Sequence, residues 1–129
     1  MDSLKKVLAA TEAALDKKAY DVVVVEVEHL SSIADYFLIA TGRSDVQVQA
    51  IARGVEERME DEREHAISVE GFQHAHWVVL DYVDVVVHVF LEPAREFYRL
   101  ERTWSDAREI ALPEPLRSQA RDLRLKALG

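Results

Sequence analysis

The chain of 129 residues contains no cysteine. A disulfide framework, thiolate chemistry and a zinc site with cysteine ligands are therefore excluded. No apolar run approaches the roughly 20 residues that span a bilayer. The N-terminal segment carries Asp2, Glu12 and Asp16, unlike a signal or transit peptide. The length suits one domain that buries a core without disulfides or metal, and we expect a cytoplasmic protein.

The net charge of −8 is unevenly distributed along the chain. Residues 115–129 contain four basic side chains and one acidic side chain, a net charge of +3, which leaves −11 for residues 1–114. An acidic body repels phosphate backbones, so limited or no direct RNA binding and a basic protein partner are expected. Acidity for solubility alone explains the same charge equally well.

Hydrophobic periodicity predicts an α/β protein with a mixed β-sheet of about five strands flanked by helices. The expected elements are a helix capped by Ser3 that ends near Lys17 and Lys18, strands at 22–27 and 35–41, a helix capped by Ser44 or Asp45, strands at 66–69, 77–82 and 85–90, and a helix that starts at Glu92 and Pro93.

Each predicted helix has an apolar stripe that should face the core. These stripes are Leu4, Val7, Leu8, Thr11 and Leu15 in the first helix, Val48, Ile51, Ala52, Val55 and Met59 in the second, and Phe97, Leu100 and Trp104 in the third. Residues 112–115 predict a stiff linker, and the basic tail beyond it, although it could form a short amphipathic helix, is expected to be disordered or lightly docked. The expected division is a domain at 1–107 and a linker with a basic extension at 108–129.

Three separated segments resemble one known family. They are Ala-Asp-Tyr-Phe-Leu-Ile-Ala-Thr-Gly at 34–42, the apolar stretch with two aspartates at 77–90, and Arg-Glu-Phe-Tyr-Arg-Leu-Glu at 95–101. In this order they closely resemble the ribosomal silencing factor family, also called the Iojap-like family, over roughly residues 3–107. The resemblance implies a nucleotidyltransferase-like topology without the catalytic motif.

The same resemblance implies a non-catalytic translation repressor without cofactors. Such a protein would bind a basic ribosomal protein of the L14 type on the intersubunit face of the large ribosomal subunit and block association with the small subunit. A homodimer of the free protein is left open. The alternatives are an acidic interaction module for another basic partner and a metal-dependent nucleotidyltransferase.

Two aspartates interrupt the apolar pattern at 77–90, and a buried strand cannot leave them unpaired. An aromatic anchor beside carboxylates suits a basic protein surface. The expected partner-binding residues are Trp77, Asp81, Tyr82 and Asp84, with Glu70 and Tyr98 as further candidates. A core position competes for Trp77 and Tyr82, and turn capping competes for Asp84.

Val83 departs from the family, which usually has glycine between the tyrosine and the aspartate. A β-branched residue there is costly if the turn needs a positive φ. The segment 71–76, Gly-Phe-Gln-His-Ala-His, also departs from the family and could alter the neighbouring contact surface.

Enzymatic alternatives find little support in the residues. Gly42-Arg43-Ser44 resembles the phosphate-binding turn of a nucleotidyltransferase, but Asp81 and Asp84 are three positions apart and would point to opposite faces of a strand. His74 and His76 lack a third metal ligand, and with His65 they are expected on the surface. His88 is expected as a core histidine. No catalytic or metal-binding residue is therefore predicted.

Overall fold

The protein folds as one mixed sheet flanked by helices, and the computed structural model describes residues 1–27, 34–94 and 107–128. The elements are α1 (Ser3–Asp16), β1 (Tyr20–Glu26), β2 (Tyr36–Gly42), α2 (Asp45–Asp61), β3 (Ser68–Glu70), β4 (Trp77–Asp81), β5 (Val85–Leu91), β6 (Arg108–Glu109) and α5 (Leu116–Leu128). The strand order is β3-β4-β5-β2-β1-β6, in which only β2 and β5 pair in parallel within these residues. The predicted mixed α/β sheet is confirmed, with the short β6 added to the five expected strands.

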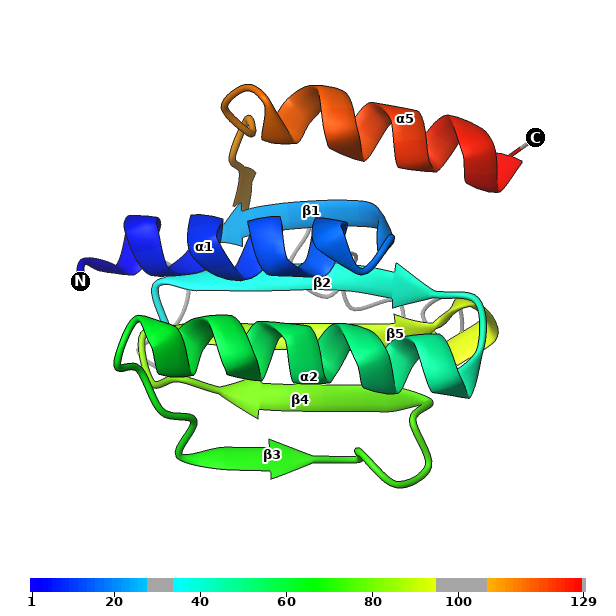
Figure 1. Ribbon diagram of the computed structural model, residues 1–129. Coiled ribbons are helices and arrows are strands. Elements are labelled where there is room, and N and C mark those ends of the chain that lie inside the picture. The colour runs from blue at the N-terminus through cyan, green and yellow to red at the C-terminus, as the bar shows by residue number, and fades with distance from the viewer. Residues whose placement is uncertain (28–33, 95–106, 129) are drawn as a thin grey trace.

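Helices α1 and α2 pack against each other and cover one face of the sheet (Figure 1). Ser44 caps α2 as predicted, because its hydroxyl accepts a hydrogen bond from the Gln47 N–H at 3.1 Å. The predicted stripe of α2 is confirmed. All of its members are fully buried: Val48, Ile51, Ala52, Val55 and Met59.

Helix α1 differs in two ways from its prediction. Its N-cap is Asp2 and not Ser3, because the Asp2 carboxylate accepts a hydrogen bond from the Lys5 N–H at 2.8 Å. Its buried surface is richer in alanine than predicted, and Leu4 remains 42% exposed. The buried alanines are Ala9, Ala10, Ala13 and Ala14. Small side chains let the helix approach the sheet closely.

The C-terminal tail forms α5, which lies beyond β1 at the edge of the sheet (Figure 1). The expectation of a disordered or lightly docked extension is wrong, because Leu112 and Leu116 belong to the main core and are 9% and 5% exposed. Arg124 also pairs with Asp21 of β1 at 3.2 Å. None of the helices in the described part of the chain is long and apolar enough to cross a bilayer.

The opposite face of the sheet carries a second, smaller apolar cluster formed mainly by β1, β2 and β5. Its buried members are Val25, Val27, Ala34, Phe37 and Val86. The predicted third helix stripe, Phe97, Leu100 and Trp104, lies outside the described residues.

Candidate protein-binding site

The turn that joins β4 to β5 brings the two predicted aspartates together around Val83. The Tyr82 N–H donates to the Val85 carbonyl oxygen at 2.9 Å, and the Asp84 N–H donates to the Tyr82 carbonyl oxygen at 3.0 Å. The Asp81 carboxylate accepts a hydrogen bond from the Val83 N–H at 2.8 Å. The side chain that caps the turn is therefore that of Asp81, whereas the sequence leaves turn capping as an alternative for Asp84.

Val83 has a φ of +76° and is 59% exposed. This is the left-handed region, which glycine occupies freely and a β-branched residue occupies only with strain. The sequence-based concern about this position is thus confirmed: the turn keeps a glycine-like backbone while it presents an apolar side chain to solvent.

The Asp84 side chain points to the helical side of the sheet, where it meets Lys6 of α1. The Lys6 Nζ donates to the Asp84 Oδ1 at 2.6 Å and lies 3.3 Å from the Glu64 Oε2. Lys6 is only 6% exposed, whereas the Asp84 side chain is 32% exposed. The backbone oxygen of Asp84 accepts from the N–H groups of Asp35 and Tyr36. The turn is therefore fixed to α1 and to β2, and Lys6 also links it to Glu64, which follows the end of α2.

Lys6 carries its charge in this largely buried position. Burial lowers the pKa of its ammonium group, but hydrogen bonds and charge interactions with Asp84 and Glu64 outweigh burial and raise it. The raised pKa keeps Lys6 as a positive partner for Asp84. The Asp84 carboxylate remains partly accessible at the surface although it pairs with Lys6.

Trp77 lies half-buried on the other face of the sheet, within an aromatic cluster. Its Nε1–H donates to the Nδ1 of His88 at 3.1 Å, and its ring stacks on Phe90 with centroids 5.1 Å apart. The His88 ring also meets Phe37 edge to face at 4.9 Å. These contacts fix the orientation of Trp77 and leave part of its surface accessible.

His88 is the core histidine that the sequence predicts, at 6% exposed. Burial lowers the pKa of its imidazole to about 4. Because Nδ1 accepts the Trp77 hydrogen bond, the proton of the neutral ring lies on Nε2, and this buried atom has no hydrogen-bond partner among the described residues.

The remaining predicted site residues occupy different positions. Tyr82 is 3% exposed in the main core, where burial, followed by the charges of Glu56 and Glu60, raises the pKa of its hydroxyl. The Tyr82 side chain therefore anchors the turn to the main core and offers little surface to a partner. Glu70 is exposed on the edge strand β3. Tyr98 lies outside the described residues.

Sequence reasoning missed Lys6 and Glu64. A lysine in a helix is normally solvent-exposed, and Lys6 lies off the predicted leucine stripe of α1. The available signal was its spacing: Ala10 and Ala13 follow at i+4 and i+7, so Lys6 continues the buried alanine surface. A buried lysine needs an acidic partner, and Asp84 and Glu64 fill that role.

The residues that could suggest nucleotidyl transfer lie far apart. The parallel pairing of β2 with β5 runs from Tyr36 opposite Val85 to Gly42 opposite Leu91. The turn that begins at Gly42 therefore lies roughly 20 Å from the end of the sheet that holds Asp84. A phosphate turn and metal-binding acids must be adjacent to act on one nucleotide, so these residues do not form such a site.

The described histidines also agree with a surface or core role. His65, His74 and His76 are exposed, as predicted. Across residues 1–27, 34–94 and 107–128, no group of three histidine or acidic side chains is arranged to hold a metal ion.

Comparisons with known proteins agree with the motifs. Residues 1–127 match the family model described as "Ribosomal silencing factor during starvation". The chain is 46% identical to the ribosomal silencing factor of Bacillus subtilis over 105 residues, which cover 81% of this chain and 87% of that protein. It is also 36% identical to the chloroplastic Iojap protein of Arabidopsis thaliana. The 124 aligned residues cover 94% of this chain and 50% of that protein.

Solved structures extend the similarity to three dimensions. A crystal structure of a Chromobacterium violaceum protein superposes with a TM-score of 0.80 at 32% identity and covers 81% of this chain and 88% of that one. A Bacillus halodurans crystal structure gives a TM-score of 0.75 at 36% identity and covers 84% of this chain and 98% of that one. The chain therefore belongs to the ribosomal silencing factor family, whose members are ribosome-associated regulators of translation.

Proposed function

We propose that this protein represses translation by binding a basic ribosomal protein of the L14 type on the intersubunit face of the large ribosomal subunit. The bound protein then blocks association with the small subunit. The observation that carries the proposal is the family match across residues 1–127. The names of the relatives identify them as silencing factors and not as enzymes.

The binding surface is centred on the β4–β5 turn. Val83 is 59% exposed and lies between two partly accessible carboxylates, Asp81 and Asp84. An apolar side chain flanked by acids suits a basic protein surface, because it buries apolar area while the acids pair with lysine or arginine. Trp77 and Glu70 extend this surface across the sheet, and Tyr98 remains a candidate.

The mechanism is occupancy of the joining surface, and no chemical step is needed. Lys6 serves this mechanism indirectly, because its pairing with Asp84 at 2.6 Å holds the turn in one conformation before binding. A pre-formed turn loses little conformational entropy when it docks. We therefore propose a non-catalytic protein without cofactors, which acts in the cytoplasm, where the ribosomal subunits join.

Sedimentation with purified ribosomal subunits tests this function. The protein is mixed separately with large and with small subunits and centrifuged through sucrose. We expect it to sediment with the large subunit alone. If the protein remains at the top of the sucrose in the presence of saturating large subunits, or if it sediments with small subunits, the proposed function is wrong. An acidic module for another basic partner would then be the better account.

A further inference from the structure

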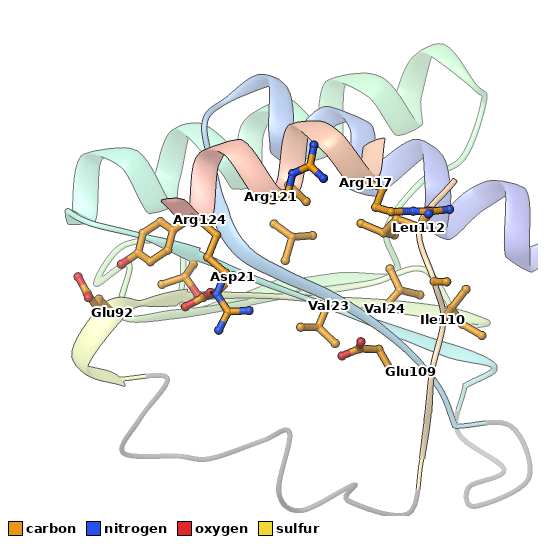
Figure 2. Close-up of a pocket in the computed structure, with 15 residues that line it drawn as sticks. Asp21, Val23, Val24, Glu92, Glu109, Ile110, Leu112, Arg117, Arg121 and Arg124 are labelled. Atoms are coloured by element: carbon orange, nitrogen blue, oxygen red, sulfur yellow. The ribbon is translucent and has the colours of Figure 1, made fainter. Parts of the chain in front are cut away.

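A pocket of about 730 Å³ lies between α5 and β1 (Figure 2). Its lining contains three arginines and three acidic side chains, so its charge favours neither an acidic nor a basic occupant. A smaller pocket of about 150 Å³ lies between the end of α2, β3 and the β4–β5 turn. Its described lining comprises Glu56, Glu60, Glu64, His65, Tyr82 and two apolar side chains, without lysine or arginine. We call this smaller hollow the acidic pocket.

Two of the three carboxylates in the acidic pocket lack a counter-charge. Glu64 pairs with Lys6 at 3.3 Å and with the amino group of Met1 at 3.7 Å. In the described part of the chain, Glu56 and Glu60 have no ion-pair partner. Glu56 is half-buried, and burial, followed by the charge of Glu60, raises the pKa of its carboxyl group. The two side chains lie at i and i+4 on α2, so a cation between them would relieve their repulsion.

The arginines of α2 and of the residues just beyond it do not fill the acidic pocket. Arg58 pairs with two acids outside the pocket. The Arg53 guanidinium group lies over the Phe72 ring, 5.0 Å from its centroid. It lowers the pKa of Glu56 by less than burial and Glu60 raise it. Arg63 is not part of the pocket lining. The excess negative charge of the acidic pocket therefore remains available to a cation from outside the described chain.

The Tyr82 hydroxyl is a further polar group of the acidic pocket. Tyr82 lines the pocket although it is only 3% exposed. Burial first, and then the charges of Glu56 and Glu60, raise the pKa of this hydroxyl, so both carboxylates lie near it. Across the residues that the structure describes, no hydrogen bond to the hydroxyl is found, and it is not one of the fully buried polar atoms without a partner. It is therefore an unpaired donor and acceptor that is open to the pocket.

We propose that the acidic pocket binds an arginine side chain of the basic ribosomal protein. This role rests on the proposed function, because Tyr82 belongs to the β4–β5 turn and the arginine enters beside Val83 as the partner docks. A planar guanidinium group carries five N–H donors, so it can bond to Glu56, to Glu60 and to the Tyr82 hydroxyl together. A metal ion is a poorer occupant, since no group of three histidine or acidic side chains in the described chain is arranged to hold one.

A peptide titration tests the acidic pocket without the ribosome. The full-length protein is labelled with nitrogen-15 and titrated at about pH 7.5, where histidine is largely neutral, with the tripeptide Gly-Arg-Gly blocked at both ends. We expect amide shifts around Glu60, Val69 and Tyr82 that saturate as the peptide is added. The citrulline tripeptide has the same shape without the charge and should not bind. The lysine tripeptide should bind about threefold or more weakly, because an ammonium group lacks the planar fan of donors.

Variants of the pocket and of its surroundings provide the matched comparison. Glu56→Gln with Glu60→Gln removes both unpaired charges and should weaken binding of the arginine peptide by about tenfold or more. Glu57→Gln with Asp61→Asn makes the same charge change at exposed positions of α2 outside the pocket and should alter binding by less than about twofold. Tyr82→Phe should weaken binding by about threefold and leave stability in urea unchanged, since the hydroxyl has no hydrogen bond to lose.

Sedimentation of the same variants with the large ribosomal subunit separates this role from the proposed function. The pocket double variant should bind the subunit about tenfold or more weakly than the control double variant. If wild type does not bind the subunit, the proposed function is wrong, and the peptide titration decides whether the pocket takes an arginine of another partner.

Other results would overturn the role of the pocket alone. These are equal subunit binding by wild type and the pocket double variant, no binding of the arginine peptide, equal binding of the citrulline or the lysine peptide, and equal losses in the two double variants. Displacement of the arginine peptide by Ca²⁺ alone would assign the pocket to a metal ion and would also overturn it.

Discussion

The Lys6 Nζ and the Asp84 Oδ1 lie 2.6 Å apart, although 78 residues separate them in the sequence. Lys6 is buried in α1, and Asp84 lies in the turn between β4 and β5. The ion pair thus links the first helix to the turn that we propose as the partner-binding surface. Damage to this pair should act first on stability and then on the conformation of the turn.

A double-mutant cycle tests this link. Asp84→Asn leaves the Lys6 charge largely buried with only Glu64 beside it, so we expect a loss of about 2 to 4 kcal/mol in the free energy of unfolding. Lys6→Met with Asp84→Asn should recover much of that loss. Denaturant titration measures each value, and Asp61→Asn, an exposed acid at the end of α2, is the control. Additive effects of the two substitutions would contradict the coupling.

The strain at Val83 predicts a stabilising substitution. Val83→Gly should raise the free energy of unfolding by about 1 kcal/mol, because glycine adopts a positive φ without steric cost. Val46→Gly is the matched control, since Val46 is 71% exposed but lies in the first turn of α2, and it should destabilise. Thermal and urea unfolding give both values. A Val83→Gly protein less stable than wild type would show that the turn is not strained.

The lowered pKa of His88 predicts a loss of stability in acid. The folded state holds the neutral ring down to about pH 4, whereas the unfolded chain binds the proton below about pH 6.5. Stability is therefore fully present above pH 6.5 and falls as the pH drops from 6.5 toward 4. The loss at pH 5 is about 2 kcal/mol, from 1.4 kcal/mol per pKa unit.

His88→Gln isolates this contribution, because glutamine can still accept the Trp77 hydrogen bond and does not titrate. Urea unfolding at pH 7 and at pH 5 should show a smaller loss for the variant than for wild type, since all other groups are shared. Equal losses in the two proteins would contradict the assignment.

The docking of α5 predicts different effects for two leucines of one helix. Leu116 is 5% exposed in the main core, so Leu116→Ala should cost roughly 2 to 3 kcal/mol. Leu125 is 60% exposed, and Leu125→Ala should change stability by less than about 0.5 kcal/mol. Circular dichroism in urea gives both values. Equal effects would mean that α5 does not share the core.

The sheet and its helices follow from hydrophobic periodicity, and α2 shows this best, since each member of its predicted stripe is fully buried. Periodicity fails where burial depends on a distant partner. Lys6 is buried because Asp84 and Glu64 balance its charge. Its spacing places it on the buried alanine surface of α1, but no local pattern identifies these two acidic partners. The prediction for the C-terminal tail is wrong for a similar reason, because Leu116 can be buried only after β1 and α1 have packed together.

The candidate site was only partly predictable. The two aspartates can be identified from the sequence because a carboxylate in an apolar strand needs a partner, and the positive φ at Val83 is suggested by the glycine that the family usually has there. The split of the carboxylates between the two sides of the turn was not predictable. It depends on Asp81 capping the turn while Asp84 meets Lys6, which lies 78 residues earlier in the chain.

The central claim is that the β4–β5 turn docks on a basic surface and blocks subunit joining. Val83 offers a matched pair at one exposed position: Val83→Arg places a cation between Asp81 and Asp84, and Val83→Glu adds a third acid with the same backbone. The measurement is light scattering as purified small and large subunits associate in the presence of each protein, with circular dichroism to confirm folding.

Wild type and Val83→Glu should suppress the scattering increase, and Val83→Arg should lose suppression by about tenfold or more in effective concentration, which is about 1.4 kcal/mol or more of binding energy. A folded Val83→Arg protein that still suppresses association as well as wild type would contradict the assignment of the turn. Normal subunit association at saturating wild-type protein would contradict the function itself.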